Sequence, residues 1–367
     1  MIPIYKPLIE DEEIVAVLNA LRSGWVSSKG KELLEFEKKF SEYVGRRYGV
    51  STSSGTTALH LALAALGIGK GAEVIVPDFT FVSPVNAVIY QNATPVLVDA
   101  EYETWGVNPD IIKKAISEKT KAVIVANMYG NSAKIDEIRE IAEDKKIFLI
   151  EDCAESIGTK YKGRIVGTSG IVSCFSFYGN KVITTGEGGM CLTDDKEIRE
   201  RLMTLRDHGM KPERRYWHDQ VGFNYRMTNM QAALGIAQLR KIKRIIQMKR
   251  RIAKIYQENL SDKLETQADP PDQKSVFWLY SILARNKRIR EKIVNELWKR
   301  EIESRNFFYP VHIMPPYRDF SYVRGKRVVS SDISKRGLNL PSYPKISDEE
   351  LDLIIKTINR VVQSNLE

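Results

Sequence analysis

The sequence predicts an α/β protein built around a mostly parallel sheet. Short apolar runs rich in Val and Ile alternate with helical patterns in the first part of the chain, and strands buried on both faces have this composition. In such sheets the chemistry gathers at the carboxyl ends of the strands, where Pro77-Asp78 and Glu151-Asp152 fall. We expect strands at 73–77, 95–98, 121–126 and 147–150, with helices such as 57–66 and 134–143 between them.

A second, smaller unit is expected in the C-terminal part. A long helical stretch at 229–260 leads out of the large unit, and the Asp269-Pro270-Pro271-Asp272 turn follows it. The remaining chain predicts a strand at 275–284, a helix at 289–300, further extended segments and a closing helix from Ser347. We therefore divide the chain into a large domain at 1–240 and a small α+β domain at 241–367.

Composition limits the class of protein. The chain has 367 residues, 43% of them hydrophobic, which is enough to bury a substantial core. Its three cysteines form no CxxC pair, so we expect no disulfide scaffold and a cytoplasmic location. The N-terminal residues lack the apolar core of a signal peptide, and no run is long enough to span a bilayer. The four histidines show no metal-ligand spacing, so we expect no metal site.

The net charge of +9 raises the alternative of a nucleic-acid-binding regulator. The densest basic patch, at 240–251, is interleaved with isoleucines at helical spacing. This pattern favours the solvated face of an amphipathic helix, and no recognised reading module accompanies it. We therefore expect no nucleic-acid partner, although a positive field can attract a diphosphate sugar.

One segment carries the most information about chemistry. Lys181 stands at the end of the apolar, strand-like run Phe175-Ser176-Phe177-Tyr178-Gly179-Asn180, and the glycine-rich turn 184–189 follows it. This is how an enzyme presents an amine to a carbonyl cofactor such as pyridoxal phosphate. The ring nitrogen of that cofactor must stay protonated, which requires a facing carboxylate. Asp152, at the end of the predicted strand 147–150, is the candidate.

The phosphate of such a cofactor needs its own cradle. Ser54, Gly55 and Thr56 lie between a strand at 48–51 and an apolar helix, where free backbone N–H groups and hydroxyls bind a dianion. We expect Ser176 to alternate with Lys181 along one strand and to donate a further hydrogen bond. Each motif alone is common as a cap or a turn, but the three in this order are far more specific.

These motifs resemble the DegT-type sugar aminotransferases, which are pyridoxal-phosphate enzymes of the aspartate-aminotransferase-like fold type I. The resemblance runs from Lys29-Gly30 through Ser54-Gly55-Thr56, Glu151-Asp152-Cys153-Ala154-Glu155 and Lys181 to Leu340-Pro341. It implies that Lys181 binds the cofactor covalently, that Asp152 faces its ring nitrogen, and that Gly55, Thr56 and Ser176 contact its phosphate. It also implies that Phe81 stands against the cofactor, and that Glu155 lies near it where relatives often carry Gln or His. Asn224 would reach the phosphate in a neighbouring subunit, which implies a homodimer with shared active sites.

The resemblance also implies substrates. The segments 177–181, 184–190, 216–218 and 224–229 are most similar to members that aminate GDP-4-keto-6-deoxymannose with L-glutamate, a step of O-antigen or polysaccharide biosynthesis. Candidate substrate-binding residues are Arg226, His312, Tyr216 and Trp217. A UDP- or dTDP-linked keto sugar stays open as the acceptor. Some relatives carry histidine in place of the lysine and dehydrate a sugar instead, an alternative against which Lys181 argues.

Overall fold

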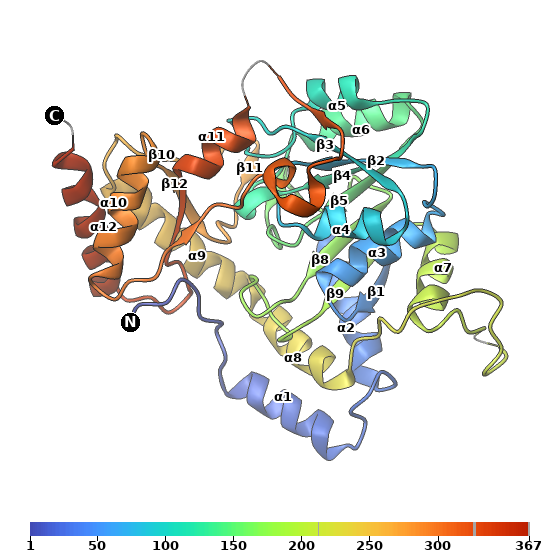
Figure 1. Ribbon diagram of the computed structural model, residues 1–367. Helices are drawn as coiled ribbons and strands as arrows, with labels where there is room; N and C mark the ends of the chain where they lie inside the picture. Colours follow the sequence, from blue (N-terminus) through green and yellow to red (C-terminus); the bar gives the residue numbers. More distant parts are fainter. Residues whose placement is uncertain (212, 326–327, 366–367) are drawn as a thin grey trace.

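The computed structural model describes residues 1–211, 213–325 and 328–365, and its centre is an eight-stranded sheet (Figure 1). β9 runs antiparallel to both of its neighbours, and all other adjacent strands are parallel. The predicted α/β class with a mostly parallel sheet is therefore confirmed. In spatial order the strands are β1 (Tyr48–Thr52), β9 (Gly189–Thr193), β8 (Val172–Ser176), β5 (Phe148–Asp152), β4 (Thr120–Ala126), β2 (Glu73–Pro77), β3 (Thr94–Val98) and β14 (Tyr322–Val323).

Helices cover both faces of this sheet because alternate strand residues point to opposite sides. Val74 and Val76 pack into one apolar cluster, whereas Ile75 between them belongs to another. The first face is covered by α3 (Gly55–Ala65), α4 (Ser83–Tyr90) and α7 (Lys196–Arg206). The second is covered by α2 (Lys31–Val44), α5 (Pro109–Ala115), α6 (Ile135–Asp144) and α8 (Asn229–Arg240).

The predicted helical stretch at 229–260 is two helices, α8 and α9 (Ile242–Asn259). They meet at Lys241, which leaves the helical region with φ −98° and ψ 2°. The Lys241 ammonium lies 3.0 Å from a carboxylate oxygen of Glu10 and 2.7 Å from one of Glu13. Glu10 is the N-cap of α1 (Asp11–Arg22), and Glu13 lies in its first turn. The packing of α1 against α8 thus fixes the break.

The C-terminal part contains a four-stranded antiparallel sheet, β10-β12-β15-β13, packed against α10 (Lys287–Trp298), α12 (Asp348–Gln363) and α9. Its strands are β10 (Glu265–Thr266), β12 (Tyr280–Leu283), β15 (Gly337–Leu340) and β13 (Arg305–Asn306). A short sheet joins β11 (Gln273–Lys274) to β6 (Lys160–Tyr161) and β7 (Arg164–Ile165). The remaining elements are α11 (Val329–Arg336) and three short 3-10 helices, Met128–Gly130, Val311–Ile313 and Pro315–Tyr317.

The domain division at residue 240 stays a prediction, and two segments cross it. Ile2 forms a bridge with Ile302 in the C-terminal part, whereas β14 adds to the edge of the large sheet. None of the helices in the described ranges combines the length and apolar character that a membrane crossing needs.

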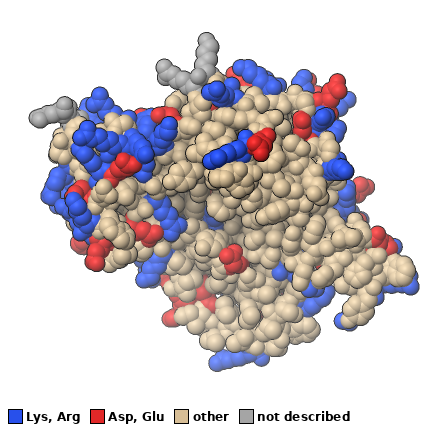
Figure 2. Space-filling model, in the orientation of Figure 1, with Lys and Arg blue, Asp and Glu red and all other residues tan. Residues whose placement is uncertain are grey.

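Lys and Arg gather over the C-terminal part of the molecule, at the left of Figure 2. Three basic residues of α9 pair with carboxylates: Arg244 lies 2.9 Å from Glu10, Arg250 lies 3.2 Å from Asp269, and Arg251 pairs with Asp348. Ile242, Ile245 and Ile252 of the same helix are buried, and Ile246 and Ile255 are partly buried. These contacts favour the amphipathic-helix interpretation of the basic patch over nucleic-acid binding.

Candidate active site

A cavity of about 520 Å³ opens at the carboxyl ends of the central parallel strands. Of the site residues predicted from the sequence, the cavity is lined by Ser54, Gly55, Thr56, Phe81, Asp152, Glu155, Ser176 and Lys181. They come from β5, β8, the start of α3 and loops that follow strands. Residues far apart in sequence thus meet at one sheet edge, as expected for this fold class.

Lys181 lies in the loop between β8 and β9. β8 ends at Ser176, so Ser176 and Lys181 do not alternate along one strand as the sequence suggested. The loop is fixed at both sides of the lysine: Tyr5 Oη donates to the Lys181 carbonyl at 2.7 Å, and Trp278 Nε1 donates to the Asn180 carbonyl at 2.7 Å. These bonds hold the amine in the cavity.

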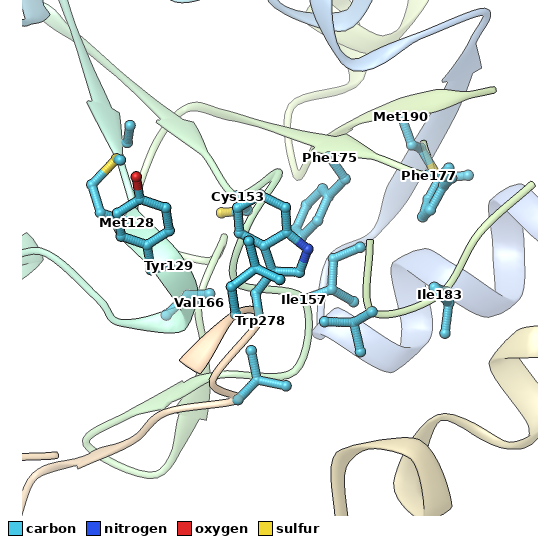
Figure 3. Close-up of a cluster of buried hydrophobic side chains, with 14 of the residues drawn as sticks. Met128, Tyr129, Cys153, Ile157, Val166, Phe175, Phe177, Ile183, Met190 and Trp278 are labelled. Atoms are coloured by element: carbon cyan, nitrogen blue, oxygen red, sulfur yellow. The ribbon is translucent and has the colours of Figure 1, made fainter. Parts of the chain in front are cut away.

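The Trp278 ring also packs against the amine, with Lys181 Nζ 3.8 Å from its centroid. Trp278 belongs to the large apolar cluster of Figure 3, together with Tyr129 and Phe175. Burial lowers the pKa of Lys181, and the charges of Glu155 and Asp152 oppose this shift. The apolar surroundings therefore favour the neutral amine, which is the nucleophilic form.

Asp152 ends β5 and is 8% exposed. Its Oδ1 accepts a hydrogen bond from the Ala154 N–H at 3.0 Å. Burial raises the pKa of Asp152 to about 6, and the Ala154 bond and the Lys181 charge act in the opposite direction. A cation placed against this buried carboxylate would stabilise its ionised form.

The start of α3 forms a cradle opposite Ser176. Ser54 caps the helix, accepting from the Thr57 N–H at 3.2 Å, and the following N–H groups point along the helix axis toward the cavity end. A Cβ added to Gly55 would lie 2.8 Å from the Ser176 Cβ, closer than atoms pack. The close approach of helix and strand therefore requires glycine at position 55. Beside it, the Thr56 and Ser83 hydroxyls lie 2.7 Å apart.

Glu155 approaches Lys181 from another side. Its Oε1 lies 3.8 Å from Lys181 Nζ, and its Oε2 accepts from the Tyr129 N–H at 3.0 Å. Tyr129 adopts a left-handed conformation with φ 49° in the turn after β4. Burial raises the pKa of Glu155 to about 7, with the charge of Lys181 opposing. A carboxylate that titrates near neutrality thus faces the amine.

Phe81 is half-exposed at the cavity, and its ring centroid lies 5.9 Å from that of Phe308. The sequence did not reveal several other lining residues: Tyr129, Trp278, Arg305, Asn306 and Asn339. Most of them belong to the C-terminal part or to turns, where no local motif marks them. Only the folded chain brings them to Lys181.

The other predicted site residues lie outside the cavity lining of this chain. Asn224 is exposed and accepts from Arg226 Nε at 3.1 Å, and Arg226 Nη1 pairs with Asp207 at 2.8 Å. Tyr216 and Trp217 are exposed and belong to the connection between α7 and α8, which extends at the right of Figure 1. His312 contacts residues outside the cavity lining. Its Nδ1 lies 2.7 Å from Asp78 Oδ2, and its ring stacks on Tyr322 at 4.3 Å between centroids.

Comparison with known proteins identifies this arrangement. Residues 7–359 match the DegT/DnrJ/EryC1/StrS aminotransferase family. The chain belongs to this family. The GDP-perosamine synthases of Escherichia coli O157:H7 and Vibrio cholerae are 45% and 41% identical to it, and each alignment covers 98% of both proteins. Its fold is similar to that of a putative sugar aminotransferase, Spr1654, from Streptococcus pneumoniae in the PLP form, with a TM-score of 0.94, 29% identity and 100% of each chain covered.

DegT/DnrJ/EryC1/StrS aminotransferases depend on pyridoxal phosphate, so the chain is a pyridoxal-phosphate-dependent aminotransferase with the expected fold type I architecture. The cavity fits this cofactor. It contains the buried Lys181 amine, the buried Asp152 carboxylate, and the start of α3 at Gly55. The Ala154 N–H binds only Oδ1 of Asp152, so Oδ2 can face the cofactor. These three groups match the aldehyde, the ring nitrogen and the phosphate of the cofactor.

Proposed function

We propose that this aminotransferase transfers the amino group of L-glutamate to the 4-keto carbon of GDP-4-keto-6-deoxymannose, giving GDP-perosamine. The observation that carries the proposal is the full-length similarity to GDP-perosamine synthases, at 45% and 41% identity. A role in polysaccharide biosynthesis agrees with the 36% identity to the spore coat polysaccharide biosynthesis protein SpsC of Bacillus subtilis. The cytoplasm, where nucleotide sugars are made, is the proposed location.

In this proposal Lys181 carries the cofactor and moves the proton. Pyridoxal phosphate, when bound, accepts the electrons released at the carbon that exchanges its amino group. Asp152 holds the proton on the ring nitrogen, and Gly55, Thr56 and Ser176 hold the phosphate, with Ser54 shaping the helix start. The free Lys181 Nζ would take a proton from the donor and return one to the acceptor. Glutamate and the sugar would react in turn at one site, so ping-pong kinetics are expected.

Two substitutions test these roles. Lys181→Ala should abolish the adduct with pyridoxal phosphate that borohydride traps, and retention of the adduct would show that another lysine carries the cofactor. Asp152→Asn should keep cofactor binding but lose most turnover, because an amide cannot hold the pyridinium charge. A near-normal rate for Asp152→Asn would refute its assignment.

The acceptor is tested by mass spectrometry of the products from GDP-, UDP- and dTDP-linked keto sugars with L-glutamate. We expect an amino sugar from the GDP-linked substrate. Efficient amination of a UDP- or dTDP-linked sugar alone would replace the proposed acceptor. Loss of water from the sugar without an amino product would favour the dehydratase alternative, which Lys181 opposes because relatives of that type carry histidine.

We infer that the enzyme is a homodimer. Ile14, Leu18, Leu21 and Trp25 form an exposed apolar stripe on α1 and the turn after it, at the lower edge of Figure 1. Such a stripe on a surface helix commonly marks an interface. Asn224 and Arg226 lie outside their own cavity, and the family resemblance assigns Asn224 to the neighbouring subunit's phosphate. A second copy of the chain is therefore the proposed partner of α1.

A further inference from the structure

Arg305 holds a particular place at the mouth of the cavity. Among the described lining residues, only Lys181 and Arg305 carry a positive charge. Three carboxylates face the same space, those of Asp152, Glu155 and Glu187. Both proposed substrates are anions, because glutamate has two carboxylates and the acceptor has a diphosphate. A cavity lined mainly by carboxylates needs a positively charged side chain to bind these anionic substrates. Lys181 is assigned to the cofactor, which leaves Arg305.

The guanidinium of Arg305 is free to take a new partner. Its Nε and Nη2 lie 3.4 and 3.3 Å from Glu303 Oε1, and both side chains are partly exposed. An ion pair of this kind is weak and is readily exchanged for a better one. Glu303 does not depend on it, because its Oε2 accepts from the Ile4 N–H at 2.8 Å.

The backbone that carries Arg305 is fixed. Arg305 pairs with Asn339 in the antiparallel ladder of β13 and β15. Its neighbour Asn306 accepts a hydrogen bond from Arg290 Nη1 at 2.7 Å. Because β13 is held in place, the Arg305 guanidinium can bind an anion in one orientation with respect to Lys181.

We propose that Arg305 is the oxyanion-binding residue of the substrate site, where its guanidinium binds a carboxylate of the amino donor or the diphosphate of the acceptor. The inference rests on the proposed function. Arg226, the candidate from the sequence, is less suited in its own subunit, because it pairs with Asp207 at 2.8 Å and does not line the cavity. The planar fork of Arg305 matches two oxygens of either anion.

The test measures binding to the apoenzyme with two probes that cannot react. Glutarate carries the two carboxylates without the amine, and GDP carries the diphosphate, with guanosine as its uncharged reference. We expect Arg305→Ala to raise the Kd for glutarate, for GDP or for both about 10- to 100-fold, which is the range for the loss of a charge-assisted hydrogen-bonded pair. Guanosine binding should not change. Loss for glutarate alone assigns the donor carboxylate, loss for GDP alone assigns the diphosphate, and loss for both assigns a shared subsite.

Three further variants support the test. Arg305→Lys should restore part of the affinity but not the bidentate contact, which also shows that the site is folded. Glu303→Gln removes the competing charge, keeps an oxygen for the Ile4 N–H, and should tighten the same probe. Arg300→Ala is the matched control, since Arg300 pairs with Glu296 at 3.2 Å in the same part of the fold and does not line the cavity.

Unchanged glutarate and GDP affinities in Arg305→Ala would overturn the inference. This outcome is separable from failure of the proposed function. If the wild-type enzyme makes an amino sugar while neither probe depends on Arg305, the subsite is wrong and the function stands. If one probe depends on Arg305 while the wild type aminates no nucleotide sugar, the subsite stands and the proposed acceptor is wrong.

Discussion

Lys181 Nζ lies 3.8 Å from Glu155 Oε1. The two groups are both buried, and each changes the protonation of the other: the carboxylate favours the ammonium, and the ammonium favours the carboxylate. Burial acts against both charges. The pair therefore sets how much neutral amine is present near pH 7, which determines how readily Lys181 reacts with an aldehyde.

Replacement of Glu155 by Gln should lower the pKa of Lys181 further, because the carboxylate that stabilises the ammonium is lost. The glutamine oxygen can still accept the Tyr129 N–H, so the local geometry is kept. We expect the pH midpoint for cyanoborohydride trapping of pyridoxal phosphate on the apoenzyme to fall by about one pH unit. Glu187→Gln is the control, because Glu187 lines the same cavity but is exposed. An unchanged or higher midpoint in Glu155→Gln would contradict the coupling.

The sequence predicted the central chemistry because that chemistry is local. The strand expected at 73–77 coincides with β2, and Asp152 ends β5 because an apolar run there stops at a carboxylate. Ser54, Gly55 and Thr56 combine a cap, a close approach and a helix start within three residues, which leaves a clear motif.

The features that the sequence missed depend on distant contacts. No proline or glycine marks the break between α8 and α9, since it is fixed by ion pairs of Lys241 with residues of the N-terminal helix region. The strand expected at 275–284 begins only at Tyr280, because Phe277 takes a left-handed conformation with φ 48° and its N–H bonds to Ser275 Oγ. This turn brings Trp278 to Lys181, and no local sequence pattern predicts the turn.

Gly55→Ala should weaken cofactor binding. The added methyl would meet Ser176 Cβ at 2.8 Å and force the start of α3 away from β8, which opens the phosphate cradle. Overpacking of this kind costs about 1–3 kcal/mol, so we expect the Kd for pyridoxamine phosphate to rise about tenfold. Gly69→Ala is a fair comparison, because its new Cβ would meet only Gln91 O at an ordinary 3.5 Å. Equal affinities of the two variants would show that the cradle tolerates a side chain.

Leu18→Glu should disrupt the proposed dimer by placing a charge in the apolar stripe of α1. Leu353 on α12 offers a matched control, since both leucines are 41% exposed and α12 lies away from α1 (Figure 1). We expect light scattering to give a monomer for Leu18→Glu and a dimer for Leu353→Glu. Because Asn224 is proposed to serve the neighbouring site, the monomer should also lose most activity. A dimeric Leu18→Glu, or a fully active monomer, would argue against shared sites.

Lys249 on α9 is buried, and no carboxylate among the described residues pairs with it. It is 1% exposed, its Nζ donates to the Ser342 carbonyl at 2.8 Å, and the Tyr5 ring centroid lies 5.2 Å away. Burial lowers the pKa of Lys249 from 10.5 to about 7. Between these two values the unfolded chain binds a proton that the folded chain does not. This group therefore makes the free energy of unfolding rise as the pH increases from 7 toward 10.5, and adds no slope below pH 7.

Lys249→Met should remove that pH dependence, because methionine fills similar space and does not titrate. The full effect of a pKa difference of this size is about 5 kcal/mol. Between pH 7 and pH 9.5, the free energy of unfolding measured in urea should therefore change by a few kcal/mol more in the wild type than in the variant. The wild type should gain stability at the higher pH relative to Lys249→Met. Lys254→Met, on the exposed side of the same helix, should keep the wild-type response. If Lys249→Met responds to pH as the wild type does, then Lys249 stays charged in the folded protein and its contacts with the Ser342 carbonyl and the Tyr5 ring are sufficient to hold an ammonium.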